Sequence, residues 1–528
     1  MPEEIIEISH ETIGRNILLY PMLRELRVAE IIDSYCKGES EIPIGVVAET
    51  IILSRFSQER VPMYKRKEYC SKNGIGALSS IDTTKINDDR TGRALDCMSN
   101  SLSEMKAKLI VHCIKEFDIT LSEIHTDITN ILFEGSYENQ KDGQLQVTYG
   151  YTKKGQDSRC KQVNFSLSVT AQGVPIWYDA VDGNTTDSVA YLPHLFALEN
   201  LLGITSPLIV GESKLVSQSN MIAFLKAGAS FIGPASLDKN EKKRIKKLWE
   251  DGAAFQALPI KASNKPIPFW GIETERKLTD KKKDYTIRHI SIFSHQRLKV
   301  IRHNRAKNFL KAKKELHKII RCLNKYDYKT YATIHSRIKT KGYSKCPYYK
   351  IKLNQKEGLF SIQFKIDWEQ LRYDEMFDGI YVLKTNLNYE EYPMNEVLGS
   401  FKRQSKIEDC FKNIKQPPIC VSPIWLQNPE RIESLLFCVF VAFLIMALLQ
   451  IKAREKVQPK RIPLRVEGRD KLKLTASILL EAFEKVAIYN VTLLVNGKRK
   501  IIKKCSNLSS EQRDVLWALS FPSIQEYK

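Results

Sequence analysis

The chain has 528 residues, which exceeds what one compact core fills and predicts roughly two to four domains. Its composition, 43% hydrophobic and 27% charged, is that of an ordinary folded protein. The formal net charge of +21 is not ordinary: it favours a polyanionic partner, and nucleic acid before a membrane surface. A generally basic proteome is the alternative explanation of this charge.

The eleven cysteines are scattered singly, with no CxxC pair and no His-rich cluster. This pattern predicts a reducing compartment, the cytoplasm, and argues against a structural zinc site. The N-terminal stretch 1–14 has neither a basic region nor an apolar run of the kind found in signal peptides, so a secreted protein is not expected.

Residues 1–118 are predicted to form a helical N-terminal region. Apolar residues recur three and four positions apart over 44–54, 89–98 and 102–117, and a turn is expected at 72–74. Two roles remain open for this region, namely DNA binding and packing against the rest of the chain.

From residue 119 to 236 the pattern changes to strands. Strands are predicted over 123–133, 162–169, 175–181, 207–211 and 230–233, with helices over 189–202 and 215–226. Three strands, a helix, a strand, a helix and a strand is the order of a ribonuclease-H-like domain, a mixed α/β sheet with flanking helices on both faces. Asp127 falls within the first strand, and His125 is expected on the same face of the sheet as a packed neighbour.

Residues 237–390 interrupt that order and are predicted to form a basic insertion. Between Arg297 and Lys352 there are 18 Lys and Arg residues against two acids. Six tyrosines near the end of this stretch add aromatic support, so we expect DNA contact here. A solvated helical face is the alternative.

The helical pattern resumes over 391–460, predicted as the second part of the core, and is followed by a C-terminal tail over 461–528. If the stretch FKRQSKIEDCFKNIK at 401–415 is a helix, one face carries Phe401, Gln404, Glu408 and Lys415. A carboxylate and a lysine two turns apart suit a metal-dependent phosphate site. The apolar run 435–449 is shorter than the roughly 20 residues of a membrane span, so it predicts a buried core helix rather than a membrane anchor.

Several sequence blocks together resemble the DDE transposases of bacterial and archaeal insertion sequences, in a branch with a helical N-terminal region and an insertion before the last acidic residue. The blocks occur in order at 85–90, 92–96, 126–129, 149–151, 161–162, 173–175, 183–187, 401–415 and 428–433. The resemblance covers roughly residues 31–449. It implies a ribonuclease-H-like fold in which three acidic residues hold two Mg²⁺ or Mn²⁺ ions for cleavage and strand transfer of double-stranded DNA.

Carried over by position, the resemblance makes Asp127 the first acid and Glu408 the last. The second acid, an aspartate in the family, is here Glu212. The DNA contacts that it implies are Phe401, where tyrosine is usual, and Gln404, Lys412 and Lys415. Synapsis of two element ends implies a homodimer, and no membrane is involved.

The glutamate at position 212 leaves two alternatives open. Its extra methylene moves the carboxylate by about 1.5 Å, whereas two-metal sites hold their ions about 3.5–4 Å apart. The protein is therefore expected to be an active transposase with an Asp/Glu/Glu site or a catalytically impaired relative that only binds element-end DNA. A nuclease of repair or RNA metabolism does not explain the blocks at 183–187 and 401–415.

Overall fold

The computed structural model describes residues 4–37, 40–138, 140–151, 159–185, 191–200, 202–260, 268–280, 283–343, 346–405, 407–408, 419, 421, 424–495 and 498–527. The chain divides into two compact units: unit 1 comprises Met1–Ser230 and Ser400–Lys528, and unit 2 comprises Phe231–Gly399. Unit 2 is continuous in sequence, whereas unit 1 is built from segments on either side of it. The expected insertion at 237–390 falls inside unit 2, and the finer division into five domains stays a prediction.

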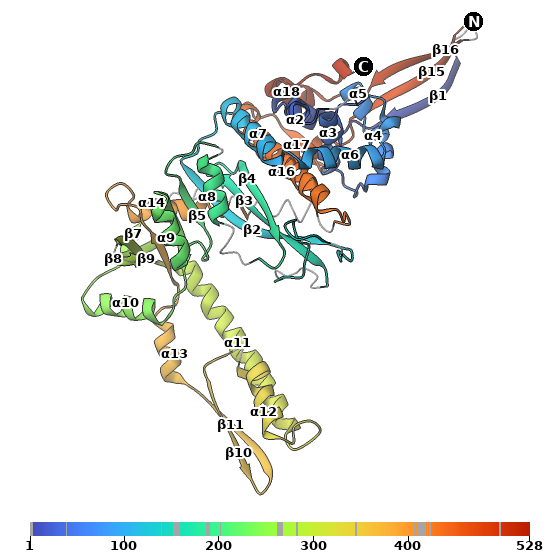
Figure 1. Ribbon diagram of the computed structural model, residues 1–528. Coiled ribbons are helices and arrows are strands. Elements are labelled where there is room, and N and C mark those ends of the chain that lie inside the picture. Colours follow the sequence, from blue (N-terminus) through green and yellow to red (C-terminus); the bar gives the residue numbers. More distant parts are fainter. Residues whose placement is uncertain are drawn as a thin grey trace. The chain divides into compact units, whose positions relative to one another are not determined.

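Unit 1 contains a mixed sheet in the order β4-β3-β2-β5 (Figure 1). Its strands are β2 (Glu123–Phe133), β3 (Lys161–Thr170), β4 (Pro175–Asp182) and β5 (Leu208–Gly211). β3 pairs antiparallel with β2 and β4, whereas β5 runs parallel to β2. Four of the five strands predicted over 119–236 are thereby confirmed.

The chain order around this sheet is that of a ribonuclease-H-like fold. After β4 come α8 (Tyr191–Asn200), β5, α9 (Gln218–Lys226) and β6 (Ser230–Ala235). The backbone N–H of Ser230 donates to the carbonyl of Pro207 at 3.0 Å, so β6 begins beside the start of β5. The fold class is therefore mixed α/β, as the sequence predicts.

Helices cover both faces of the sheet. On one face α8 contributes His194, whose Nδ1 lies 2.7 Å from Ser168 Oγ on β3. On the other face α16 (Pro429–Lys452) places Phe440 against Tyr178 of β4, with ring centroids 4.9 Å apart. Tyr178 pairs with Leu167, which pairs with Asp127, so α16 covers the face that carries Asp127.

The apolar helix α16 is a core helix of unit 1. The helical stretch 429–460 is long and apolar enough to cross a membrane by length and composition, but 89% of its apolar window is buried inside the structure. It packs against α3 (Ile44–Ser54) and α6 (Asp88–Ser99) as well as against β4. The prediction of a buried run at 435–449 is confirmed.

The remaining elements of unit 1 are helices and the strands of two small sheets, β1-β15-β16 and β13-β14. N-terminal helices are α1 (Asn16–Glu25), α2 (Val28–Tyr35), α4 (Arg66–Lys72), α5 (Ile75–Ser79) and α7 (Leu102–Glu116), and C-terminal elements are β13 (Leu464–Val466), β14 (Arg469–Lys471), α17 (Ala476–Ala482) and α18 (Ser510–Leu519). The N-terminal region is not wholly helical, because β1 (Glu4–Glu11) pairs antiparallel with β15 (Ile488–Val495), which pairs with β16 (Lys498–Cys505). The C-terminal tail thus contains the hairpin β15–β16, and the residues between its strands, 496–497, lie outside the described residues. Sequence periodicity missed β1 because its partner strand lies at the opposite end of the chain.

Unit 2 contains antiparallel strands and a long helix. Its elements include α10 (Lys239–Glu250), β7 (Gln256–Leu258), β8 (Phe269–Asp280), β9 (Lys283–Ser294), α11 (His295–Cys322), α12 (Tyr331–Arg337), β10 (Tyr349–Lys356), β11 (Leu359–Ile366), α13 (Trp368–Glu375), β12 (Ile380–Thr385) and most of α14 (Met394–Arg403). Within the sheet the order is β6-β12-β9-β8-β7. The antiparallel hairpin β10–β11 packs its apolar face on α11 and α12.

Candidate active site

Asp127 lies in the middle of β2, with 6% of the residue exposed. Its Oδ1 accepts a hydrogen bond from the backbone N–H of Ile128 at 2.7 Å. A carboxylate at a mid-strand position is held rigidly, because the backbone on both sides is fixed by the ladders to β3 and β5. The structure therefore supplies one well-placed oxygen ligand on the face covered by α16.

Glu212 is the residue that directly follows β5. In the parallel ladder Thr126 pairs with Gly211, so Asp127 and Glu212 are the residues that directly follow the last pair of this ladder. The Glu212 side chain is exposed, and its backbone N–H donates to the Tyr191 hydroxyl at 3.3 Å. The structure thus brings the first two predicted acids together at the carboxyl end of a parallel strand, where ligands of open α/β sheets commonly bind.

A partly buried polar cluster joins the end of α14 to the start of β2, and we name its residues Glu123, His125 and Arg403 the unit 1 clamp. His125 Nε2 lies 2.7 Å from Glu123 Oε1, and Arg403 Nε donates to the same carboxylate at 2.9 Å. Burial alone would raise the pKa of Glu123, but the hydrogen bonds from His125 and Arg403 outweigh it and lower this pKa to about 2. The Glu123 carboxylate therefore remains charged and holds both partners.

Gln404 extends this attachment along the strand. Its Oε1 lies 2.9 Å from His125 Nδ1, and the residue is buried. Arg403 meets Glu123 and Gln404 meets His125, so helix and strand advance in the same direction. His125 and Asp127 share one strand face, and the turn of helix that follows Gln404 therefore runs toward Asp127.

Glu408 lies on that following turn and is exposed. The helix is not the regular one expected from the sequence, because α14 ends at Arg403 and Gln404 forms a turn before the helical residues 405, 407 and 408. Gln404 N–H donates to Phe401 and Ile407 N–H donates to Gln404, both three residues back. Over the described residues 401–405 and 407–408, these tighter turns depart from the regular helix predicted from the sequence, and Gln404 at the turn is buried.

Two buried polar atoms along this face have no hydrogen-bond partner in the part of the chain that the structure describes. They are Gln404 Nε2 and Thr129 Oγ1. Thr129 is two residues beyond Asp127 and therefore on the same face. Unpaired buried polar atoms are costly, and they are expected where a bound group completes the hydrogen bonding.

The donor chemistry of the three acids fits a hard divalent cation, because carboxylate oxygens are the ligands that Mg²⁺ and Mn²⁺ prefer. Among the described residues, however, no group of three or more His, Cys, Asp or Glu side chains is close enough together to hold a metal ion. Asp127 and Glu212 are neighbours. The chain after Gln404 leads toward them, but Glu408 does not form one ligand group with them among the described residues. The three residues therefore fit a metal by donor type, and they do not form one metal-binding group among the described residues.

The other predicted contact residues are placed only in part. Phe401 is half-buried near the end of α14. Lys412 and Lys415 lie outside the described residues. Sequence reasoning missed Glu123 and Arg403, although polar residues at 123, 125 and 127 on one face of an otherwise buried strand were a usable signal.

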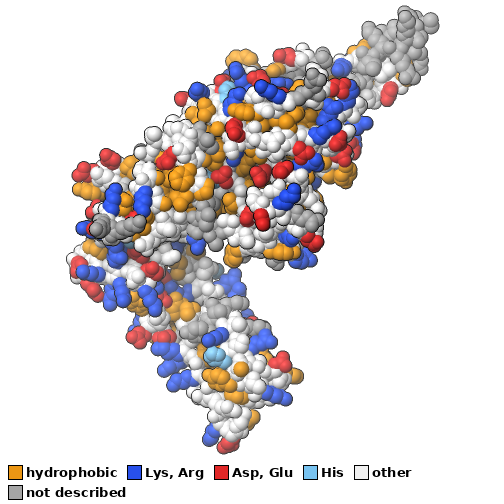
Figure 2. All heavy atoms as spheres, viewed as in Figure 1, with side chains coloured by type: hydrophobic (Ala, Val, Ile, Leu, Met, Phe, Trp, Pro, Cys, Tyr) orange, Lys and Arg blue, Asp and Glu red, His pale blue; other side chains and the backbone are white. Residues whose placement is uncertain are grey.

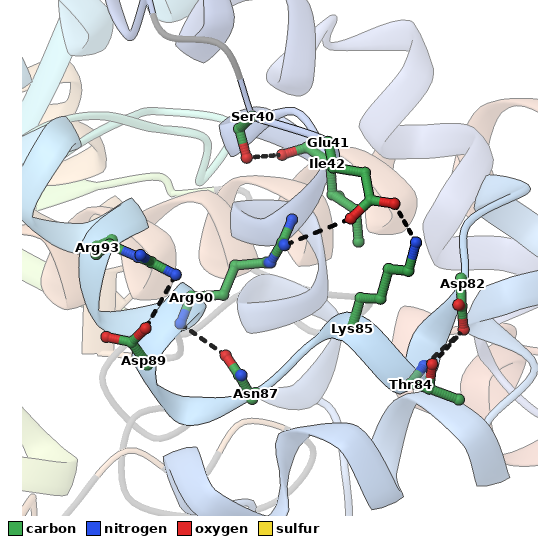
Figure 3. A network of polar contacts seen from close by, with 10 residues as sticks. All are labelled: Ser40, Glu41, Ile42, Asp82, Thr84, Lys85, Asn87, Asp89, Arg90 and Arg93. Carbon is green, nitrogen blue, oxygen red and sulfur yellow. Dashed lines mark hydrogen bonds and ion pairs between the residues drawn. The ribbon is translucent and has the colours of Figure 1, made fainter.

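The N-terminal block at 85–96 has a structural role (Figure 3). Lys85 and Arg90 both form ion pairs with Glu41, the second at 3.8 Å, and Arg93 pairs with Asp89 at 2.9 Å. These pairs are largely exposed, so each contributes at most about 1 kcal/mol. Together they connect the start of α6 to the segment before α3.

The same block also docks onto the start of α16. The Arg431 guanidinium donates hydrogen bonds to both carboxylate oxygens of Asp96, at 2.6 and 2.7 Å. A Cβ at Gly92 would lie 2.8 Å from Arg431 Nη1, so only glycine lets the guanidinium approach this closely. Ser434 Oγ adds a hydrogen bond to the carbonyl of Leu95 at 2.7 Å. The blocks at 92–96 and 428–433 therefore occur together because they pack together.

Three further blocks converge on the sheet face opposite Asp127. Gln162 donates to the carbonyl of Gly183 at 2.8 Å and accepts from Asn130 Nδ2 at 2.7 Å. A Cβ at Gly150 would lie 1.9 Å from the carbonyl oxygen of Gly183, so the two backbones pass in direct contact. These residues brace the end of β2, and they explain the blocks at 149–151, 161–162 and 183–185 without a catalytic role.

Comparisons with known proteins add little to this geometry. Residues 9–110 match a family described as a domain of unknown function (DUF4277). No curated protein matches the chain. Two solved structures with some likeness are the Mos1 transposase paired-end complex with left transposon end and the Mos1 strand transfer complex; in each the match has 11% identity and a TM-score of 0.15, and covers 37% of this chain and 60% of the other. The chain thus spans about three fifths of those proteins, and at that TM-score the likeness carries no argument about fold or activity.

Proposed function

We propose that this protein is the DNA transposase of an insertion sequence, which binds the ends of its element and catalyses metal-dependent cleavage and strand transfer. The observation that carries the proposal is the placement of Asp127 beside Glu212 in parallel register, with the chain that bears Glu408 fixed to the same face of β2. Two strand-borne acids and one helix-borne acid are the arrangement that phosphoryl transfer with two metal ions uses. The sequence blocks supply the family, and the sheet order is compatible with it.

The three acids share one role in this proposal. Asp127, fixed in β2, would hold the metal ions together with Glu212 and Glu408. When bound, the ions supply Lewis-acid activation of the attacking oxygen and stabilisation of the leaving oxygen at phosphorus. The unpaired amide of Gln404 is available to donate to a phosphate oxygen at this site.

The proposed partners are double-stranded DNA, both element ends and target, and a second copy of the chain. Synapsis needs two active sites, one for each element end, and a homodimer supplies them. Lys412 and Lys415 follow Glu408 in the sequence and are proposed to contact DNA phosphates, and Phe401 is proposed to stack on the DNA. Action on DNA in the cytoplasm of a bacterial or archaeal cell agrees with cysteines that are scattered singly along the sequence.

A second candidate function is favoured by one observation, the glutamate at position 212. Its longer side chain is exposed and is not gathered with Asp127 and Glu408 into one ligand group among the described residues. A relative that binds element ends without cutting them would act as a repressor or be a decaying copy.

Strand cleavage of labelled element-end DNA in Mg²⁺ or Mn²⁺ separates the two candidates. The native protein, Glu212→Asp and Glu408→Gln are compared at equal DNA occupancy. Cleavage by the native protein that is abolished in Glu408→Gln supports the transposase with Glu212 as a ligand. Cleavage by Glu212→Asp alone identifies a transposase that the native glutamate disables. If none of the three proteins cleaves DNA that it binds, the binding-only candidate is supported.

A further inference from the structure

The helix α11 has two faces of opposite character. One face is apolar: Ala312, Leu316 and Ile319 are buried against the hairpin β10–β11 and α12. The opposite face carries five exposed cations at successive spacings of four, three, four and three residues, which places them on one side of a helix. These residues, which we name the α11 stripe, are Lys307, Lys311, Lys314, Lys318 and Arg321.

The α11 stripe is almost free of neutralising acids. Glu315 is the one acidic residue in the sequence of α11, and it pairs with Lys318 at 3.3 Å. Other acids near this helix pair elsewhere, since Asp378 binds Arg305 and Arg302 off the stripe. Within the described part of the chain, the remaining four cations of the stripe make no ion pair. Figure 2 shows Lys and Arg side chains over the surface of unit 2.

The dimensions of the stripe match a polyanion rather than a small ligand. Its five charges span 14 residues, or about 21 Å at 1.5 Å per residue. Like charges at this spacing repel one another, and the repulsion is relieved when a partner of high charge density lies along the helix. Duplex DNA, with one phosphate per about 1.7 Å of axis, has that density.

We propose that the α11 stripe binds the sugar–phosphate backbone of duplex DNA independently of base sequence. Four of the five residues are lysines, which contact phosphate as point charges and carry no bidentate geometry for a base edge. The stripe therefore supplies affinity and not site choice. This inference deepens the proposed function, on which it rests for the identity of the polyanion.

The test uses the full-length protein and a charge-matched control. The stripe variant carries Lys307→Gln, Lys311→Gln and Lys314→Gln, all on the solvent face of α11. The control removes three exposed lysines from the outer face of the hairpin β10–β11, which points away from α11, through Lys352→Gln, Lys356→Gln and Lys365→Gln. Both variants lose the same net charge from the same unit.

Affinities are measured by fluorescence anisotropy for an element-end duplex and a scrambled duplex over a series of NaCl concentrations. The slope of log K against log salt is expected to fall by about 2.7 in the stripe variant, about 0.9 for each lysine. The fall should be equal for both duplexes, while the control keeps the native slope. An unchanged slope in the stripe variant, or an equal fall in the control, overturns the proposal.

Two further arms keep this inference distinct from the proposed function. Asp127→Asn is expected to retain the native salt slope, so a protein that never cleaves DNA still tests the stripe. Vesicles of phosphatidylserine and phosphatidylcholine provide the competing anionic surface. If the stripe variant binds vesicles more weakly than the native protein but binds DNA equally well, the α11 stripe is a lipid-binding surface and the proposal of DNA binding is wrong.

Discussion

Each unit contains one buried Glu–His–Arg cluster, and the two differ in what lies beside them. The unit 1 clamp joins β2 to the end of α14. The unit 2 clamp, formed by Glu241, Arg244 and His289, joins α10 to β9 with His289 Nδ1 and Arg244 Nε each 2.7 Å from a Glu241 oxygen. Burial raises the pKa of Glu241, but the hydrogen bonds from His289 and Arg244 outweigh it and lower this pKa to about 2, as at Glu123.

The same chemistry therefore fastens a helix to a sheet in both units, and it marks no active site by itself. Beside the unit 1 clamp lie Asp127 and Glu212, whereas Arg244 of the unit 2 clamp donates to the Thr274 and Ser291 hydroxyls and closes a saturated network. A perturbed carboxylate is thus a weak pointer to function. The adjacent acids and the unpaired buried atoms distinguish the first site from the second.

The largest expected effect is on the acid next to the unit 1 clamp. Asp127→Asn keeps the side-chain volume and removes a charged ligand, so cleavage should fall by about 10³-fold or more, since metal assistance contributes several kcal/mol. Single-turnover cleavage of element-end DNA measures this loss. Glu250→Gln, an exposed acid of unit 2, is the control and should keep native activity; equal loss in both would remove Asp127 from the site.

The two clamp arginines should differ in their contribution to stability. The Arg244 side chain is 5% exposed, so Arg244→Met leaves Glu241 without its buried partner and should lower the stability of unit 2 by about 3 kcal/mol. The Arg403 side chain is 42% exposed, and Arg403→Met should cost about 1 kcal/mol. Denaturant titration followed by limited proteolysis measures both.

Arg403→Met should nevertheless be the more harmful to activity. Loss of a residue that positions a ligand typically costs about 10–100-fold, and here the positioned ligand is Glu408. The readout is kcat for cleavage at saturating DNA, and Arg403→Lys should recover part of it. If Arg403→Met lowers stability but leaves kcat unchanged, the unit 1 clamp has only a structural role, like the unit 2 clamp.

Both clamps predict acid sensitivity of the same sign. The folded-state pKa of Glu123 and Glu241 is about 2, below the ordinary value of 4.5. Their stabilisation is therefore fully present above pH 4.5 and is lost as the pH falls toward 2, by about 2 kcal/mol for each group after allowance for solvent. Thermal melts between pH 7 and pH 2.5 should show the loss, and Glu241→Gln should flatten it; an unchanged acid profile in that variant would contradict the assignment.

The smallest effect belongs to an exposed pair. Arg93 and Asp89 have side chains 68% and 69% exposed, so Arg93→Gln should change the free energy of unfolding by less than about 0.5 kcal/mol. Asp96→Asn, which breaks the two-point contact with Arg431, should cost more. The ratio of the two ΔΔG values checks whether the block at 85–96 is held mainly by its contact with α16.

The sequence predicted local elements well and long-range contacts poorly. The alternation of apolar residues located β2, β3 and β4 to within about a residue, and the apolar run located the core of α16. Nothing local indicates that Arg403 meets Glu123 across 280 residues, or that β1 pairs with β15. The break in the helix at Gln404 is likewise set by a tertiary contact, which periodicity does not carry.

For the candidate site, the sequence predicted which residues take part but not how they are arranged in space. Asp127, Glu212 and Glu408 follow from the sequence blocks, and the parallel register of β2 and β5 then joins the first two. The approach of Glu408 depends on the unit 1 clamp, whose members are ordinary polar residues in the sequence. The α11 stripe needed the structure to show which face of the helix is buried.

The most direct test of the central claim is a Mn²⁺ titration of the full-length protein by isothermal calorimetry, with the native chain compared to Asp127→Asn and Glu408→Gln. If the three acids form one site, the native protein binds Mn²⁺ and each single variant loses affinity by at least about tenfold, with Asp127→Asn the more severe. Native Mn²⁺ affinity in Asp127→Asn would contradict the account, because the acid at the centre of the site would then hold no metal.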